Sequence, residues 1–201
     1  MMNTNSYLLE TALTTQNATN NFFMEQKMDF LQLSKDRYSV RAFSDKAVEA
    51  EKLNKILEAG RLAPTAKNSQ SQKIFVLKSK EALDRINAVT PMTYKAPVVL
   101  MVCYDKNISY KNPTDTRIPN YDGGEVDAAI VTTAMMMEAT DLGLGTLWAR
   151  GFNSQDVYNA FPEIANLELV CLLDIGYAAN NAKPSERHTL RKSLSETVVE
   201  L

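Results

Sequence analysis

The amino-acid sequence predicts one domain in which α-helices and β-strands are mixed within a single set of packed layers. The chain has 201 residues, a length that fits one domain with a sizeable core. Helix-like and strand-like segments follow one another without an internal repeat or a linker. A long apolar helix, at 126–142, and two nearly continuous apolar strands, at 97–104 and 167–177, are expected to be buried.

The predicted elements of the first half follow from hydrophobic spacing and from helix-capping residues. In order, they are a short helix that begins after Asp29, extended chain at 37–43, a helix at 48–62, a polar loop at 65–71, a strand at 73–77 and a helix that begins after Ser79. In the second helix, Leu53, Ile56 and Leu57 recur at helical spacing. Pro64 ends that helix because proline disfavours helical geometry in the residue before it.

The second half is predicted to place the apolar helix between the two buried strands. In order, its elements are a strand at 97–104, a loop at 105–124, a helix at 126–142, a short strand at 146–149, a helix from about 153 to 160 and a strand at 167–177. The 126–142 helix has almost no polar face, which is typical of a buried central helix, and Gly143 is its expected C′ residue. A polar, basic tail follows, and the last residues, with Leu194, Val198 and Val199, are predicted to be extended.

Composition excludes some classes of partner. The chain carries 22 Lys and Arg residues against 24 Asp and Glu residues, so we expect neither nucleic acid nor a membrane surface as a partner. No apolar run approaches the length of a membrane span. Cys103 and Cys171 lie in apolar runs and are interpreted as small buried side chains, which fits a reducing cytoplasm. Residues 1–27 lack a signal-peptide pattern and are interpreted as a loose extension, with a docking helix as the alternative.

One short extended stretch carries an unusual group of side chains. Arg37, Ser39 and Arg41 point to one side of it, whereas Tyr38 and Val40 point to the other. Two guanidinium groups and a hydroxyl, with no acid, suit a phosphate group because arginine binds phosphate with a planar fork of donors. The two arginines lie roughly 13 Å apart along a strand, so they can contact different parts of one long ligand. The alternative is a strand edge with solvated arginines.

The 105–124 loop is the longest segment with no periodicity. It contains Tyr110, Arg117 and Tyr121 among Asn, Pro and Gly residues. Loops of this length are commonly functional lids. Aromatic and guanidinium side chains suit stacking over a flat molecule and holding an anionic group, so these three residues are candidate substrate contacts. An ordinary surface loop is the alternative.

Several catalytic arrangements are absent from the sequence. His188, the single histidine, lies in the polar tail, and the chain has no nucleophile elbow, no paired histidines for a metal, no Cys-x-x-Cys pair and no Walker loop. Gly143 and Gly145 precede a predicted strand rather than a helix, so they do not form a dinucleotide-binding turn. A chain with so few reactive side chains is expected to borrow its chemistry from a cofactor.

Four segments together resemble the FMN-binding signature of the nitroreductase family. They are Arg-x-Ser-x-Arg-x-Phe at 37–43, Ala-Pro-Thr-Ala-Lys-Asn-Ser-Gln at 63–70, Gly-Leu-Gly-Thr-Leu-Trp at 143–148 and a basic segment around Arg191. The resemblance extends over about residues 28–201, which are expected to form one FMN-binding domain. It implies an α+β fold with a mainly antiparallel central sheet flanked by helices, a long buried central helix and a C-terminal segment that reaches onto a partner subunit.

The resemblance also implies a set of cofactor contacts in a homodimer with FMN at the subunit interface. The residues that match are Arg37, Tyr38, Ser39 and Arg41; Pro64, Thr65, Ala66, Asn68 and Gln70, in a loop that approaches from the partner; Leu147, Trp148, Ala149, Arg150 and Gly151, beside the ring; and His188 and Arg191 in the tail. Arg37, Ser39 and Arg191 are implied at the phosphate. Arg41 is implied at the pyrimidine edge of the flavin.

The implied activity is that of an FMN-dependent oxidoreductase. A hydride passes from NAD(P)H to flavin N5 and then, after the donor leaves, to a small-molecule acceptor such as a nitroaromatic or a quinone, without a catalytic side chain. The alternatives are another flavin reaction of the superfamily, such as reductive dehalogenation or flavin breakdown, and a non-catalytic FMN-binding protein. Two departures from many relatives bear on the substrate pocket: Ser71 and Gln72 replace Pro-Trp, and Arg150 replaces an acid.

Overall fold

The computed structural model describes residues 29–201. The chain divides into two compact units, residues 1–35 and 36–201. Among the described residues, the first unit holds most of helix α2 (Phe30–Asp36), which begins where the sequence predicts because Asp29 accepts a hydrogen bond from the Leu31 N–H at 3.0 Å. The extension expected at 1–27 lies outside the described residues. All further description concerns the second unit.

A four-stranded antiparallel sheet forms the centre of this unit. Its strands are β1 (Gln72–Leu77), β2 (Val98–Tyr104), β5 (Gly145–Ala149) and β6 (Glu168–Gly176), in the spatial order β1-β2-β6-β5. All three pairings are antiparallel. The two central strands, β2 and β6, are almost entirely buried, as their apolar runs predict. The predicted α+β class is therefore confirmed.

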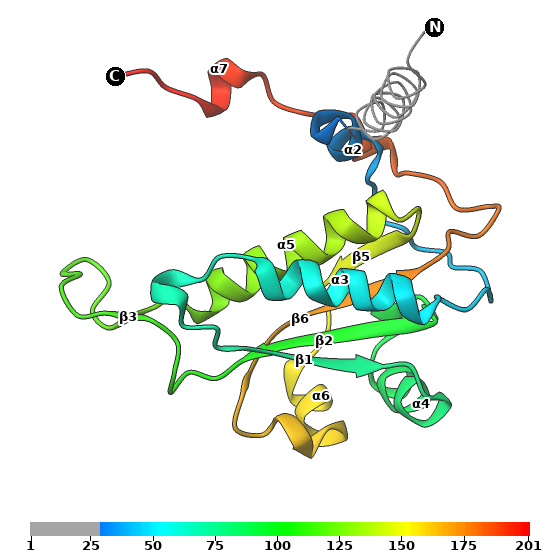
Figure 1. The fold of residues 1–201 in the computed structure, drawn as a ribbon, viewed down its shortest axis with the longest axis horizontal. Helices are drawn as coiled ribbons and strands as arrows, with labels where there is room; N and C mark the ends of the chain where they lie inside the picture. The colour runs from blue at the N-terminus through cyan, green and yellow to red at the C-terminus, as the bar shows by residue number, and fades with distance from the viewer. Residues whose placement is uncertain (1–28) are drawn as a thin grey trace, which may run out of the picture. The chain divides into compact units, whose positions relative to one another are not determined.

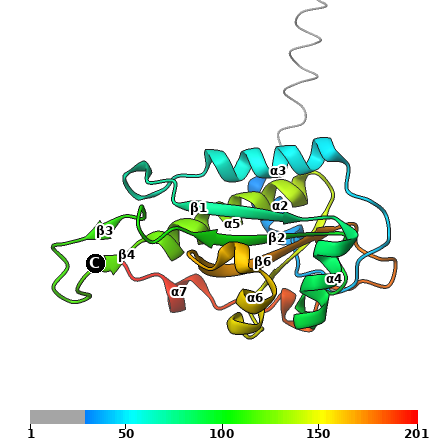
Figure 2. The same cartoon turned by 90° about the horizontal axis from the view of Figure 1, so that it is seen from below.

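Helices cover both faces of the sheet (Figures 1 and 2). The bounds of the four helices are α3 (Ala50–Leu62), α4 (Lys80–Val89), α5 (Gly124–Asp141) and α6 (Ser154–Ala160). Helices α3 and α5 share one hydrophobic cluster with one face of β2 and β6, and α4 and α6 share a second cluster with the other face. Two of these helices begin at the caps that the sequence predicts: Ser79 Oγ accepts the Ala82 N–H, and Asn153 Oδ1 accepts the Gln155 N–H.

Helix α5 is buried on one side only. Val131, Met135 and Ala139 face the core, as the apolar sequence predicts. Val126 and Ile130, on the opposite side, remain 49% and 40% exposed. The all-round burial expected from the sequence is therefore not reached within one chain, because the sheet and α3 cover only one side of the helix.

The turn from α5 into β5 depends on two glycines. Gly143 has a left-handed φ of 75°, and the Leu144 N–H donates to the Ala139 carbonyl at 2.8 Å, which ends the helix as predicted. Gly145 opens β5, and a Cβ at this position would lie 2.5 Å from the Val40 side chain. The absence of a side chain lets the stretch around Val40 lie directly against the sheet.

Two segments differ from the sequence prediction. Short strands β3 (Lys111–Asn112) and β4 (Tyr121–Asp122) pair within the loop that was expected to be irregular. Helix α7 (Leu194–Thr197) forms near the chain end, where extended chain was expected, so that expectation is wrong. The physical reason is a capping box in which Ser193 and Glu196 satisfy each other's backbone N–H groups. Four short 3-10 helices complete the secondary structure of residues 29–201: Ala66–Asn68, Pro91–Thr93, Pro162–Ile164 and Glu186–His188.

Both cysteines are buried and free, as predicted. Burial raises the pKa of the Cys103 thiol and of the Cys171 thiol to about 12, so both are protonated and unreactive at neutral pH. Within residues 29–201, no helix combines the length and the apolar character needed to cross a membrane.

One carboxyl group lies in the middle of the sheet. Asp174 in β6 is fully buried, and its side-chain oxygens have no hydrogen-bond partner among the described residues. Its neighbours across the sheet are Val99 and Leu147. Burial among these apolar side chains raises the pKa of Asp174 from 3.8 to about 8.

We predict that Asp174 makes the folded protein less stable as the pH rises from 5 to 8. In this window the folded state keeps a proton that the unfolded state releases, so the free energy of unfolding falls by roughly 1 kcal/mol per pH unit. Urea unfolding at each pH should show this slope in the wild-type protein and in the exposed-acid control Asp141→Asn. Asp174→Asn should reduce this change of the free energy of unfolding with pH. An identical slope in both variants would contradict the prediction.

Candidate functional site

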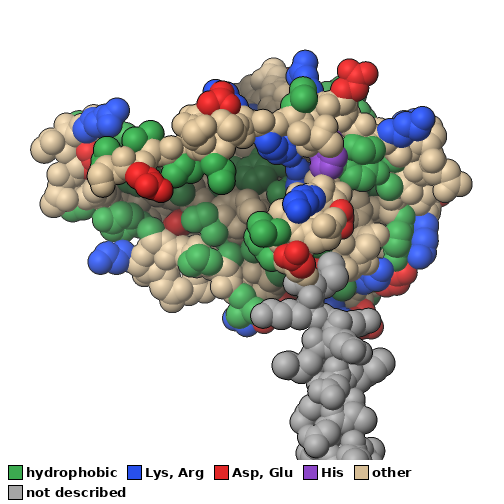
Figure 3. All heavy atoms as spheres, turned by 90° about the horizontal axis from the view of Figure 1, so that it is seen from above, with side chains coloured by type: hydrophobic (Ala, Val, Ile, Leu, Met, Phe, Trp, Pro, Cys, Tyr) green, Lys and Arg blue, Asp and Glu red, His purple; other side chains and the backbone are tan. Residues whose placement is uncertain are grey.

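Two segments that are far apart in the sequence form a small basic pocket. It has a volume of about 160 Å³ and is lined by Arg37, Tyr38, Ser39, Arg41, Ser185, Arg187, His188 and Arg191. No acidic residue is among these lining side chains. In Figure 3 the histidine lies beside Lys and Arg side chains at the edge of a hollow with a hydrophobic floor.

The first wall of the pocket is held against β5. Ser39 pairs with Thr146 in a parallel bridge, and the Val40 N–H donates to the Thr146 carbonyl at 2.9 Å. Val40 is buried beneath the stretch, whereas Arg37 and Ser39 face the pocket, as the alternation predicts.

Tyr38 is the exception to that alternation. It also lines the pocket, and its ring lies edge-on to His188 with a centroid distance of 6.1 Å. The reason is that only two isolated bridges, Ser39 with Thr146 and Phe43 with Ala178, hold this stretch, so the pleat of a fully paired strand is not imposed on it. The contact joins the N-terminal wall of the pocket to the C-terminal one.

The C-terminal wall brings further positive charge. The His188 N–H donates to the Ser185 carbonyl at 2.8 Å, and Arg191 donates to the Leu190 carbonyl at 2.7 Å, so both residues are held by contacts within the tail. Burial and the nearby positive charge of Arg191 lower the pKa of Arg37. Guanidinium groups gathered without an acid favour binding of an anion, and the volume suits a phosphate group.

In the segment expected beside a flavin ring, residues 147–151, most side chains pack into the protein interior. Leu147 and Ala149 pack in the cluster on the α4 and α6 face, and the half-buried Trp148 packs in the cluster on the α5 face. Any ligand contact from Leu147 or Ala149 must therefore use the backbone. Arg150 and Gly151 are exposed, and Arg150 donates to Ser154 Oγ at 3.0 Å.

The loop at 64–70 has a specific backbone conformation. Lys67, Asn68 and Gln70 all have left-handed φ angles, of 54°, 54° and 47°. Thr65 stabilises this shape from within the loop: its carbonyl accepts the Asn68 N–H at 2.9 Å, and its hydroxyl accepts the Gln70 N–H at 3.1 Å. Pro64, Asn68 and Gln70 remain exposed, so the polar side chains of the loop are available to a ligand or a partner.

This loop lies at one end of α5, and the chain segment at 37–41, which lines the basic pocket, lies at the other end (Figure 1). Ala66 contacts Asp127 in the first turn of the helix, whereas Ser39 pairs with Thr146, just beyond its last turn. The 14 steps from Asp127 to Asp141 span about 21 Å at a rise of 1.5 Å per residue. One chain therefore does not bring together the two groups of predicted cofactor residues.

The predicted lid is fixed at its base beside the start of α5. Asp122 accepts hydrogen bonds from the Ser109 hydroxyl at 2.6 Å and from the Gly124 N–H at 2.9 Å, and it pairs with Lys111. Burial alone would raise the pKa of Asp122, but these hydrogen bonds outweigh it and lower the pKa.

The lid's candidate substrate residues are not part of the basic pocket. Tyr110 and Tyr121 are half-buried near the base, and Arg117 is exposed at the tip. They lie toward the α5 end that carries the 64–70 loop, because the lid leads directly into Gly124, the first residue of α5.

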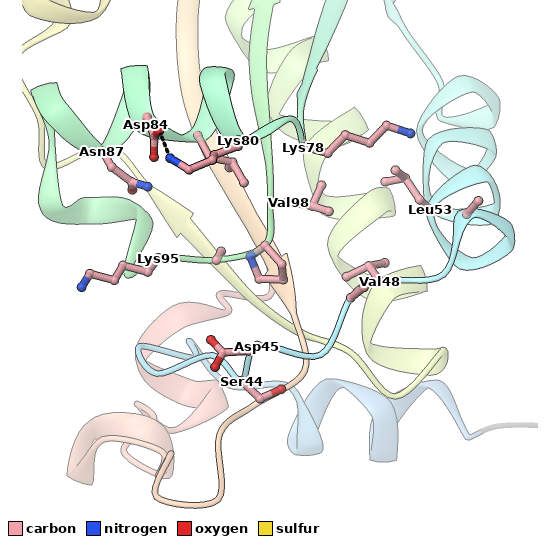
Figure 4. A pocket seen from close by; sticks show the side chains of 15 residues that line it. Ser44, Asp45, Val48, Leu53, Lys78, Lys80, Asp84, Asn87, Lys95 and Val98 are labelled. Atoms are coloured by element: carbon pink, nitrogen blue, oxygen red, sulfur yellow. Dashed lines mark hydrogen bonds and ion pairs between the residues drawn. The ribbon is translucent and has the colours of Figure 1, made fainter.

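A separate groove of about 580 Å³ lies between the segments that precede α3 and α4 and the start of β2 (Figure 4). The groove is lined by Lys78, Lys80 and Lys95 together with Asp45 and Asp84. Lys80 forms an ion pair with Asp84 at 2.5 Å. None of the predicted cofactor or substrate residues lines it. Its charges are mixed and exposed, so the smaller, acid-free pocket remains the better candidate for an anionic ligand.

Comparison with known proteins shows the family to which the chain belongs. The Nitroreductase family model matches residues 35–92 and 89–177. A curated relative from Methanothermobacter thermautotrophicus, whose name gives NADH dehydrogenase and NAD(P)H nitroreductase as candidate activities, is 28% identical over 162 residues, which cover 77% of this chain and 80% of the relative.

Two solved structures are also similar. A nitroreductase family protein from Clostridium difficile is 37% identical with a TM-score of 0.78, and the match covers 86% of this chain and 98% of that one. A protein from Desulfovibrio desulfuricans, crystallised in complex with FMN, is 26% identical with a TM-score of 0.69, over 88% of this chain and 98% of that one. This chain belongs to the nitroreductase family. It is an oxidoreductase, as its sequence predicts.

Proposed function

We propose that residues 28–201 bind FMN and use NAD(P)H to reduce a nitroaromatic or quinone acceptor, in a cytoplasmic homodimer with FMN at the subunit interface. Bound FMN supplies hydride transfer, which no side chain of this chain can perform. The observation that carries the proposal is the acid-free pocket formed by Arg37, Ser39 and Arg191. A related structure crystallised in complex with FMN supports it.

The donors in the pocket fit the phosphate of FMN. Arg37 and Arg191 supply guanidinium forks and Ser39 a hydroxyl, which together suit the oxygens of a phosphate group. At about 160 Å³, the pocket is smaller than the roughly 300–1,000 Å³ typical of whole-ligand sites. The rest of the cofactor must therefore extend out of this pocket, past Arg41, which also lines it, toward the backbone of residues 148–151. Arg41 is exposed and donates a hydrogen bond to the Ser39 carbonyl at 3.3 Å, which it would exchange for a contact with the pyrimidine edge.

A second copy of the chain would complete the site. The 64–70 loop lies too far from the pocket to serve it within one chain, so we propose that each loop serves the cofactor of its partner. Exposed apolar side chains support such an association: Val126 and Ile130 on α5, and Leu190, Leu194 and Val199 on the tail. The tail is proposed to reach onto the partner.

The lid is proposed to contact the acceptor. Tyr110, Arg117 and Tyr121 belong to the α5 end that carries the 64–70 loop, so a loop donated across the dimer would bring the lid with it. The exposed Arg117 suits an anionic group on the acceptor. This placement favours an oxidoreductase over a simple FMN-binding protein.

The first test concerns the cofactor. Arg37→Ala should weaken FMN binding by about 2 kcal/mol, or roughly 30-fold in Kd, because it removes a charge-assisted contact with phosphate. Fluorescence titration of the apoprotein with FMN measures this change. Lys106→Ala, which removes one exposed positive charge outside the pocket, should bind FMN like the wild type. Equal affinity in both variants would refute the assignment of the phosphate pocket.

The second test uses a hybrid dimer with two affinity tags. One chain carries Arg37→Ala, and the other carries Asn68→Ala together with Gln70→Ala. If each loop serves the partner's cofactor, both defects fall in one site and the other site is intact, so half of the sites should bind FMN with wild-type affinity. Two weakened sites, or a stable monomer that still holds flavin in sedimentation, would contradict the shared site.

The third test concerns the lid. Replacing Arg117 and Tyr121 by Ala should lower kcat/KM about tenfold for at least one acceptor, since a contact worth 1–2 kcal/mol is lost. The affinity for FMN should not change. Thr116→Ala, at the exposed tip of the same loop, is the control. Wild-type kcat/KM for every acceptor tested would make the segment an ordinary loop.

A further inference from the structure

A buried acid connects the 64–70 loop to α5. Asp127, in the first turn of the helix, is 3% exposed. One of its oxygens accepts the Ala66 N–H at 2.9 Å, and the other accepts the Ser69 hydroxyl at 3.2 Å. Both donors come from the loop, about 60 residues earlier in the chain. Both carboxylate oxygens of Asp127 are therefore hydrogen-bonded to this one loop.

The helix itself does not explain why this acid is buried. Glu125, in the same first turn, is exposed and already supplies a negative charge near the positive end of the helix dipole. Burial of a second acid costs free energy unless its oxygens are satisfied, and here the loop satisfies both of them. The position of Asp127 is thus explained by its contacts with the loop.

The loop needs such an anchor because its backbone is strained. Left-handed φ angles at three non-glycine residues are unfavourable and persist only where the surroundings fix them. Thr65 fixes the loop from inside, but it cannot fix the loop relative to the rest of the chain. Asp127 contacts Ala66 and Ser69, which lie on either side of Lys67 and Asn68. These contacts therefore fix both the shape of the turn and its orientation relative to the helix.

We propose that Asp127 is a positioning residue for the cofactor site of the partner subunit. It does not contact the cofactor. It holds Ala66 and Ser69 so that Asn68 and Gln70 project in the conformation that the site requires. This inference rests on the proposed function, because it assumes that the loop contacts FMN.

Three variants separate positioning from general stability. Asp127→Ala removes both acceptors, and Asp127→Asn keeps one oxygen for the Ala66 N–H. Ala66→Pro removes the donor instead; the residue opens a 3-10 helix, where proline is tolerated, and Thr65 before it is already extended at ψ 152°. Glu125→Gln is the matched control, since it removes an acid from the same turn without touching the loop.

The measurements are the Kd for FMN, the visible circular dichroism of the bound flavin and the Tm of the apoprotein. Asp127→Ala and Ala66→Pro should raise the Kd about tenfold, equivalent to 1.4 kcal/mol, and alter the flavin dichroism. Asp127→Asn should restore the dichroism and most of the affinity, and Glu125→Gln should match the wild type. A purely structural role would lower the Tm of the Asp127 variants in proportion to their loss of affinity and leave the dichroism of bound flavin unchanged.

The outcomes distinguish this inference from the proposed function. Wild-type Kd and dichroism in both Asp127→Ala and Ala66→Pro would overturn the positioning role, while a loss of binding in Arg37→Ala would leave the proposed function standing. If Asp127→Ala does not fold, Ala66→Pro and Asp127→Asn decide the question by the same two measurements. A wild-type protein that binds no FMN would overturn both.

Discussion

The packing of α5 against the sheet fixes the distance between the parts of the candidate site. Backbone hydrogen bonds make the helix a rigid spacer, and its buried side chains hold it against β2 and β6. The basic pocket lies beyond one end of this spacer, and the 64–70 loop and the lid belong to the other. A chain built in this way offers a place for a phosphate but not a complete enclosure for a flavin. The proposed site would therefore need a second copy of the chain, and the uncovered side of α5 offers a surface for that association.

The side chains of this chain are better suited to holding a cofactor than to performing chemistry. Both thiols are protonated and buried, and the single histidine packs against Tyr38 in the pocket wall. Neither buried acid lines the basic pocket. Asp127 accepts hydrogen bonds from the 64–70 loop, and Asp174 lies among apolar neighbours in the sheet. In the proposed site, specificity would then arise from shape and charge around the flavin ring, to which the exposed Arg150 and Arg117 would contribute.

Sequence patterns predict the parts of this structure that depend on local spacing. The alternation of Arg37, Ser39 and Arg41 predicts one wall of the pocket, and capping residues predict where several helices begin. Long-range contacts are missed. Asp127 looks like an ordinary first-turn acid because its donors lie some 60 residues away. Asp174 is hidden in an apolar run, since nothing in the pattern of a buried strand shows that one member lacks a partner.

The pocket also constrains the order in which the molecule is assembled. Its two walls meet where Tyr38 contacts His188, a separation of 150 positions that spans most of the chain. Contacts between such distant residues form late, because a long intervening loop must first be closed. During synthesis the Arg37 wall leaves the ribosome about 150 residues before the His188 wall that completes the pocket. The basic pocket thus forms only after residues 185–191 have joined the fold.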